Sequence, residues 1–151
     1  MNDYWQAQRD YNKEREYFLE RAKEVSGKLE IRLIKQGMRG LFANRTFNKG
    51  EIILLLKGNY FNKPTRTSIQ VGNNKHVENY EGGLINHHCN PSANIVVIPE
   101  VEPALVVANK TIFKGEEITF DYETTEEVMA EPFKCECHGK LIEGWNSVPR
   151  T

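Results

Sequence analysis

Residues Gly115–Tyr122 read GEEITFDY, and this stretch decides how the rest of the chain is interpreted. A Lys-Gly turn signal at residues 114–115 opens it, and β-branched and aromatic residues follow. The expected strand ends on an adjacent acid and phenol, Asp121 and Tyr122. A tyrosine in a short strand is usually an ordinary half-buried side chain. At a strand end its hydroxyl can also point into a cavity, and the other stretches of the chain favour this second interpretation.

Length and composition indicate one globular domain. The chain has 151 residues, of which 39% are hydrophobic and 27% charged, so it can build one core and is too apolar for a disordered protein. The net charge is −1 and the isoelectric point is about 6.4. These values argue against a protein that binds nucleic acid through a basic surface.

The sequence contains no recognisable membrane span or signal peptide, and this bears on the cellular compartment. No apolar run approaches the roughly 18 residues of a membrane span, and the polar, charged start of the chain is unlike a signal peptide. The three cysteines are odd in number, and two of them are Cys135 and Cys137. We therefore expect an intracellular protein, cytoplasmic or nuclear, in which this pair has a metal or loop role rather than a disulfide role.

Charge is balanced overall but uneven along the chain. Residues 32–75 contain nine Lys or Arg residues and one acid, whereas residues 116–131 contain seven acids and no base. The simpler interpretation is two solvated faces that partly neutralise each other. The functional interpretation is an acidic rim, with Glu126 and Glu127 in it, that attracts a cationic substrate.

The order of patterns predicts one helix followed by many short strands. Residues 3–25 carry apolar residues at spacings of three, four or seven, and Ser26-Gly27 can end this amphipathic helix. Residues 46–52 and 111–118 share one pattern, in which a Lys-Gly turn and an acid precede an apolar strand. Strands are expected at residues 29–34, 41–44, 51–57, 68–71, 93–98, 104–108 and 117–122. The sequence therefore predicts a mainly β domain, and the absence of βαβ alternation argues against a doubly wound nucleotide fold.

Two further stretches carry the residues of a candidate site. Residues 37–43 read GMRGLFA, and glycines before a strand let a ligand approach the backbone, although a lone turn is the simpler interpretation. No third glycine follows, so this is not a dinucleotide fingerprint. Residues 84–91 read LINHHCNP, in which Asn86 can donate and accept hydrogen bonds. An Asn-His-x-Cys run is consistent with a metal site or a Cys/His nucleophile, but no third orienting residue is evident.

GMRGLFA, INHHCNP and ANKTIFKGEEITFDY, in this order and at these distances, resemble a SET domain. This family consists of protein-lysine methyltransferases that use S-adenosylmethionine (SAM). The resemblance covers roughly residues 29–145, and the second and third motifs are its most specific part. It implies a mainly β, β-clip-like fold of small antiparallel sheets, with a knot-like crossing where the Asn-His and Asp-Tyr stretches meet. The chain then divides into the N-terminal helix at 1–27, a SET domain at 28–130 and a truncated post-SET-like tail at 131–151.

The resemblance also implies which residues hold the cofactor. The residues expected to bind SAM are Met38, Arg39, Gly40, Asn86, His87, Tyr122 and Trp145. Asn86 is expected to hold the methionine moiety and the backbone of His87 the adenine. Trp145, with Phe133 behind it, is the aromatic residue expected to close the pocket.

Tyr122 is implied to be the catalytic tyrosine at the methyl-transfer pore, which the lysine enters through a narrow channel from the opposite face. A sulfonium methyl is already activated, so neither a covalent intermediate nor a metal is needed. The attacking amine has to be neutral, and an apolar channel beside a cation lowers a lysine pKa from its usual value of about 10.4. Phe120, the second implied catalytic residue, leaves room at the pore where a Tyr would crowd it, so we expect di- or trimethylation.

The tail departs most from the family pattern. Many members bind zinc through a Cys-x-Cys-x4-Cys segment together with the cysteine of Asn-His-x-Cys. Cys89, Cys135 and Cys137 match this pattern, but Ile142 stands where the third tail cysteine is expected. His138 is adjacent to Cys137 and would need strained geometry to act as the fourth ligand. A four-thiolate site is therefore incomplete, and no bound metal is expected.

The expected function is SAM-dependent methyl transfer to a lysine of a basic, Lys/Arg-rich protein such as a histone, with no direct nucleic-acid or membrane partner. The alternative is a catalytically silent SET-fold module that binds a protein partner. A catalytically inactive domain is under no need to keep Asn86, His87 and Tyr122. Their joint presence therefore favours the enzyme. A purely structural zinc-ribbon-like domain is disfavoured by the missing fourth ligand.

Overall fold

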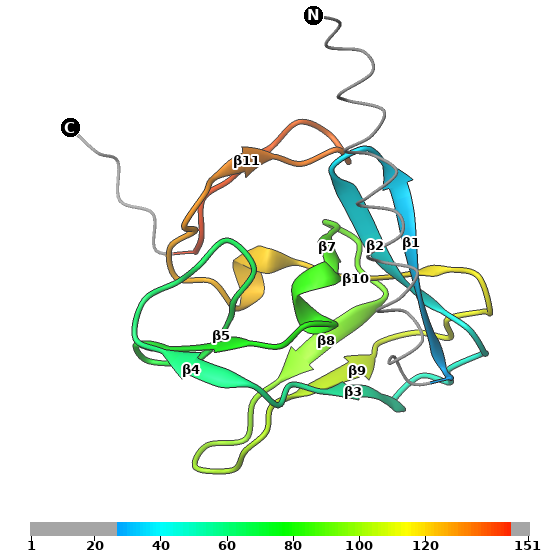
Figure 1. Ribbon diagram of the computed structural model, residues 1–151, viewed down its shortest axis with the longest axis horizontal. Helices are drawn as coiled ribbons and strands as arrows, with labels where there is room; N and C mark the ends of the chain where they lie inside the picture. The colour runs from blue at the N-terminus through cyan, green and yellow to red at the C-terminus, as the bar shows by residue number, and fades with distance from the viewer. Residues whose placement is uncertain (1–26, 146–151) are drawn as a thin grey trace, which may run out of the picture.

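The computed structural model describes residues 27–145, which form a mainly β protein of four small sheets (Figure 1). The helix expected at residues 3–25 lies outside this range. Two short 3-10 helices, η1 (Gly82–Leu84) and η2 (Tyr122–Thr124), interrupt the strands. Within the described residues, no helix combines the length and apolar character needed to cross a membrane.

The largest sheet has the strand order β1-β2-β10-β7 and carries the motifs singled out in the sequence. Its members are β1 (Leu29–Lys35), β2 (Met38–Ala43), β10 (Glu117–Phe120) and β7 (Asn86–His87). Leu41 on β2 is the register partner of Ile118 on β10, and both side chains are fully buried. Burial of two such side chains contributes roughly 3–6 kcal/mol to folding, which fixes β10 in the core.

The pairing of β10 with β7 is parallel, whereas the other strand pairs in the described residues are antiparallel. Thr119 is aligned with Asn86, and Phe120 with His87. A further backbone hydrogen bond of 3.1 Å runs from His88 N–H to the carbonyl of Phe120. This pairing brings two stretches more than thirty residues apart into contact and places the end of β10 beside the Asn-His stretch.

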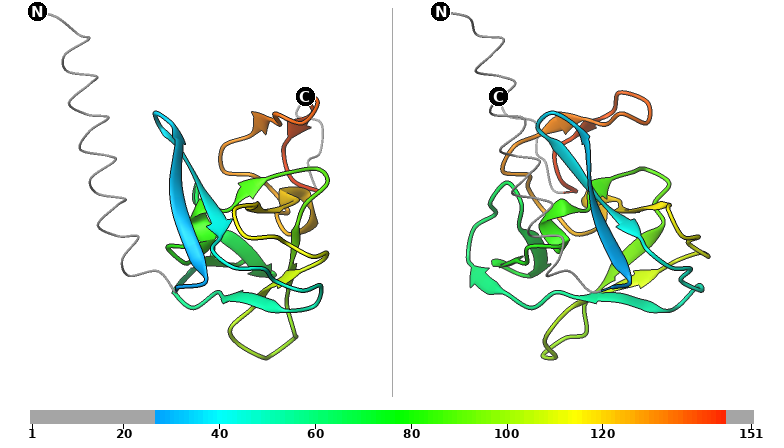
Figure 2. Two further views of the ribbon diagram at one scale, coloured as in Figure 1. Left: turned by 90° about the vertical axis from the view of Figure 1, so that its right-hand side faces the viewer. Right: turned by 45° about the vertical axis from the view of Figure 1, so that its right-hand side comes forward.

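Two three-stranded sheets and a hairpin complete the protein. The sheets have the strand orders β3-β9-β8 and β4-β6-β5. Their strands are β3 (Ile52–Leu55), β9 (Leu105–Ala108), β8 (Ala93–Val96), β4 (Asn59–Phe61), β6 (Lys75–Glu78) and β5 (Ile69–Gly72). The hairpin of β11 (Phe133–Lys134) and β12 (Leu141–Ile142) stands beside the tip of the β1–β2 hairpin (Figures 1 and 2), where Lys35 forms an ion pair with Glu136 at 3.3 Å.

The seven expected strands are confirmed, with ends that differ by a few residues. Strands β4, β6, β7, β11 and β12 were not expected, because each has only two to four residues and none has an alternating pattern. The two similar strand entries are also confirmed. Phe47 and Ile112 pair in an antiparallel bridge, and Gly50 and Gly115 have nearly equal positive φ values of 91° and 93°. A side chain would be strained at both glycine positions.

Candidate active site

A cavity of about 690 Å³ lies between the start of β2, β7 and the tail hairpin. Of the residues expected to hold the cofactor, five line it: Met38, Arg39, Asn86, His87 and Tyr122. Gly37, which has a φ of 78°, lines it as well. A volume of this size lies within the range of roughly 300–1,000 Å³ that is typical of pockets for small molecules and cofactors.

Asn86 is held rigidly at the wall of this cavity. Its side-chain amide donates to the carbonyl of Arg39 and to Oε2 of Glu117, each at 2.8 Å. Its Oδ1 accepts no hydrogen bond within residues 27–145, so Asn86 presents a fixed acceptor to a ligand. Glu117 also lines the cavity, which gives the wall a carboxylate that the sequence motifs do not assign to the site.

Gly40 supports the site from behind and is not among the lining residues. A Cβ at this position would lie 2.9 Å from Oε2 of Glu117 and 3.0 Å from side-chain carbons of Ile34 and Phe42. The missing side chain therefore makes room for the carboxylate that holds Asn86 in place. This second glycine of the loop matters for packing rather than for direct contact with the cavity.

Phe133 is the aromatic residue of the tail that lines the cavity, whereas Trp145 does not line it. Trp145 is 60% exposed, and its backbone N–H donates to the carbonyl of Glu126. The Phe133 ring makes edge contacts with His87 and Tyr122, with centroids 5.9 and 5.8 Å away. The tail hairpin directs Phe133 inward because its backbone pairs with Ile142, a residue that is fully buried.

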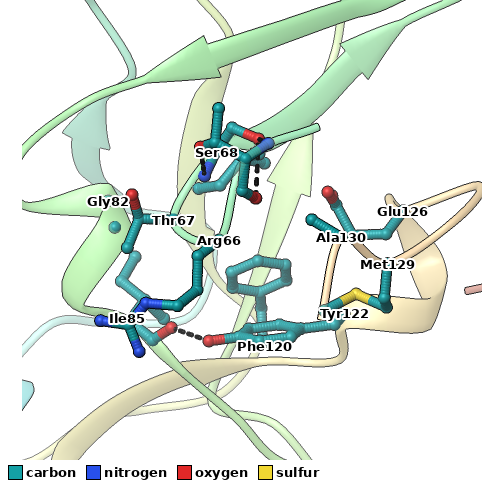
Figure 3. A pocket seen from close by; sticks show the side chains of 13 residues that line it. Arg66, Thr67, Ser68, Gly82, Ile85, Phe120, Tyr122, Glu126, Met129 and Ala130 are labelled. Atoms are coloured by element: carbon teal, nitrogen blue, oxygen red, sulfur yellow. Dashed lines mark hydrogen bonds between the residues drawn. The ribbon is translucent and has the colours of Figure 1, made fainter. Parts of the chain in front are cut away.

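A second, much smaller cavity of about 30 Å³ adjoins the first and shares Tyr122 with it. Its walls combine apolar residues, among them Ile85, Phe120 and Met129, with polar ones such as Thr67, Ser68 and Glu126 (Figure 3). Phe120 is almost fully buried, and its ring lies 4.8 Å from the Tyr122 ring at an angle of 44°.

Tyr122 lines both cavities and is held by two hydrogen bonds. Its hydroxyl donates to the carbonyl of Ile85, and its backbone N–H donates to Nδ1 of His87 at 3.1 Å. Asp121 caps η2 by accepting from Glu123 N–H at 3.0 Å, which turns the chain sharply after β10. Burial, with the carboxylates of Glu126 and Glu117 nearby, raises the pKa of the Tyr122 hydroxyl, so the phenol is neutral at physiological pH.

Comparison of the sequence with known proteins identifies the family of this chain. The model of the SET domain matches residues 38–123. This range contains the INHHCNP and GEEITFDY motifs and most of the residues that line the two cavities. The chain belongs to the SET domain family. It also resembles a curated protein from Cryptococcus neoformans var. neoformans serotype D (strain B-3501A), named histone-lysine N-methyltransferase, H3 lysine-4 specific. The two are 37% identical over 65 residues, which are 41% of this chain and 4% of that protein.

The SET motif cysteine and the tail cysteines lie together. One ligand atom each from His87, Cys89, Cys135 and Cys137 lies within 4.8 Å of the other three. The Sγ atoms of Cys89 and Cys135 are 3.8 Å apart. Burial first, and then the neighbouring thiols, raise the pKa of Cys89 to about 12. The tail therefore returns to the motif as the SET resemblance implies, and three thiols face one another.

His87 is poorly suited to complete a metal site with these thiols. Its Nδ1 accepts a hydrogen bond from the backbone of Tyr122, so the neutral ring carries its proton on Nε2. Burial lowers the pKa of His87, which favours this neutral form. Nε2 is the atom that faces Cys89, at 3.3 Å, and a protonated nitrogen cannot bind a metal. Nδ1 of His138 lies 3.7 Å from Cys135 Sγ.

The acidic stretch of residues 116–131 is not one continuous rim. Glu117 lines the large cavity, Glu123 pairs with Lys140 at 2.6 Å, and Glu126 is only 4% exposed. The interpretation of Glu126 as part of an acidic rim is therefore wrong. Its position after η2 turns its side chain inward, toward β5.

Sequence reasoning also missed Thr67 and Met129, which line both cavities but belong to no recognisable motif.

Proposed function

We propose that this protein is a SAM-dependent methyltransferase that acts on a lysine of a protein. One observation carries the proposal: Tyr122 lines both a large cavity bordered by Asn86 and His87 and a second, narrow cavity bordered by Phe120. Transfer of a methyl group between two bound molecules needs two compartments that meet at one point. Membership of the family and the name of the fungal relative support the same reaction.

The donors and acceptors of the large cavity fit SAM. SAM carries a positive sulfonium and an ammonium group, and the wall offers the Glu117 carboxylate and the unused Oδ1 of Asn86. We assign Met38, Arg39, Asn86 and His87 to the binding of this cofactor, with Gly40 in support and Phe133 rather than Trp145 as its aromatic cover. When bound, SAM supplies an activated methyl group.

The residues of the chain contribute position and environment. The rings of Phe120 and Tyr122 form an apolar wall that excludes water and favours the neutral amine. The Tyr122 oxygen and the Ile85 carbonyl stand together at one wall and can accept weak C–H hydrogen bonds from a methyl group. Such alignment of reacting groups is worth roughly 7–11 kcal/mol of the barrier. We further propose that Phe120 permits di- and trimethylation, because its ring cannot hold a water molecule in the pore.

We propose a Lys/Arg-rich substrate, for which a histone tail is the first candidate to test. The relative is named as specific for lysine-4 of histone H3, but this chain spans only 4% of its length. A histone substrate would place the protein in the nucleus. Of the acidic stretch, Glu116 and Glu131 remain exposed and can contribute to attraction of a basic segment.

The test is transfer of labelled methyl from SAM to mixed core histones and other basic proteins, with wild type beside Tyr122→Phe. Tyr60→Phe is the matched control, because it removes a hydroxyl from β4, outside the residues that line the two cavities. We expect label on lysine with the wild type and the control, and a rate lower by roughly a hundredfold in Tyr122→Phe. Measurable SAM binding without any transfer to these proteins would instead favour the catalytically silent module.

A further inference from the structure

One acidic side chain belongs to the wall of the narrow cavity. Glu126 lines this cavity together with Phe120, Tyr122 and Met129, and only 4% of the residue is exposed. In Figure 3 it stands on the same side as Met129 and Ala130, opposite Ile85 and Gly82. A carboxylate is costly in such a place unless a partner compensates for the loss of water.

Hydrogen bonds hold Glu126 in place without using all of its acceptors. Oε2 accepts from the backbone N–H of Gln70 at 2.8 Å and from the hydroxyl of Thr125 at 2.7 Å. The side chain of Gln70 in turn accepts from Glu127 N–H at 2.7 Å, so β5 and the segment after η2 are tied together. Oε1 of Glu126 accepts no hydrogen bond within residues 27–145 and is not among their fully buried unpaired atoms. Glu126 therefore has an unused acceptor that is not fully enclosed by described residues.

The basic residue of the cavity wall does not form an ion pair with Glu126. Arg66 is the basic side chain among the lining residues, and it pairs with Glu131 at 3.8 Å while 66% of its side chain stays exposed. Glu126 forms no ion pair with a described residue. Burial raises the pKa of Glu126, although both of its hydrogen bonds lower it. Two hydrogen-bond donors thus hold the carboxyl group of Glu126 on the wall of the narrow cavity.

We propose that Glu126 binds the ammonium group of the incoming lysine and makes the narrow cavity selective for a cationic side chain. The proposal rests on the proposed function, because it concerns the channel assigned there to the substrate. It is distinct from attraction by an outer acidic surface, since the carboxylate lies inside. Glu126 would offset the cost of removing the ammonium from water before the amine loses its proton. Neutral side chains of similar length, including acetylated lysine, would gain nothing from it.

The test compares two small probes of the channel, n-butylammonium and 1-butanol, which match the lysine stem with and without charge. Their dissociation constants for the full chain are measured by NMR titration in the presence of S-adenosylhomocysteine. We expect the wild type to prefer the cation by roughly ten- to hundredfold, as for a hydrogen bond between charged groups. Glu126→Gln is expected to remove the preference for the cation, because it removes the negative charge. The variant should still fold, since the amide oxygen can accept from Gln70 and Thr125 as the carboxylate does.

The control Glu116→Gln removes one charge from the same stretch, on the exposed surface, and is expected to keep the wild-type preference. A preference that survives in Glu126→Gln would overturn the proposal, and so would a wild type that binds both probes equally. The second result needs no variant, so it stands even if Glu126→Gln does not fold. Preference for the cation without methyl transfer to any protein would count against the proposed function and not against the cation site.

Discussion

Substitution of Gly40 by alanine tests whether the glycine loop acts through the packing behind Asn86. The new Cβ would lie 2.9 Å from Glu117 Oε2 and 3.0 Å from Ile34 Cδ1 and Phe42 Cε1, so these atoms must move. All three belong to the outer parts of side chains, and the strand can therefore still form. The movement of Oε2 should break its 2.8 Å hydrogen bond to Asn86. Glu117 also lines the cavity, so the effect should reach the cofactor.

The magnitude follows from the bond that is lost. A hydrogen bond to a charged group is worth roughly 1.5–3 kcal/mol, and overpacking of a tight site costs roughly 1–3 kcal/mol of folding free energy. We expect the dissociation constant for SAM to rise roughly ten- to hundredfold in Gly40→Ala. A domain of this size should also lose roughly 2–10 °C in Tm.

Calorimetric titration of SAM, with a thermal melt of each variant, measures both quantities. Gly72→Ala is the matched control, because its Cβ would meet its nearest neighbour, Lys75 Cβ, at an ordinary 3.5 Å. The control should keep the wild-type affinity. If Gly40→Ala bound SAM within about twofold of the wild type, the idea that Glu117 positions Asn86 for the cofactor would be refuted.

Two further predictions concern the pore and the thiols. In Phe120→Tyr the added hydroxyl would enter a cavity of about 30 Å³. We therefore expect the product of a methylated peptide, measured by mass spectrometry, to shift from di- or trimethyl-lysine to monomethyl-lysine. A wild type that stops at monomethyl-lysine would contradict the role assigned to Phe120. Elemental analysis of the purified protein should find much less than one zinc per chain, because His87 Nδ1 accepts from Tyr122 and its protonated Nε2 is the nitrogen that faces the three thiols. Stoichiometric zinc that is lost in Cys135→Ser would show this reasoning to be wrong, and loss in His138→Ala would identify the fourth ligand.

Local sequence was sufficient for seven of the twelve strands in the described residues and for recognising the two most specific motifs. Gly115–Tyr122 forms β10 and η2 because a Lys-Gly turn precedes a run of β-branched and aromatic residues and an aspartate caps the turn that follows. These features depend on neighbours a few residues away, which a single sequence displays.

Tertiary structure alone decided which side chains meet at the two cavities. Glu126 belongs to a run of acids that looks like a solvated surface, and it is buried only because β5, more than fifty residues earlier, offers the N–H of Gln70. Trp145 was the expected aromatic cover, with Phe133 behind it, but the pairing of the tail hairpin places Phe133 at the cavity. The three thiols meet because the tail returns to β7. Such contacts join distant segments, so their partners are set by packing of the whole chain and not by local pattern.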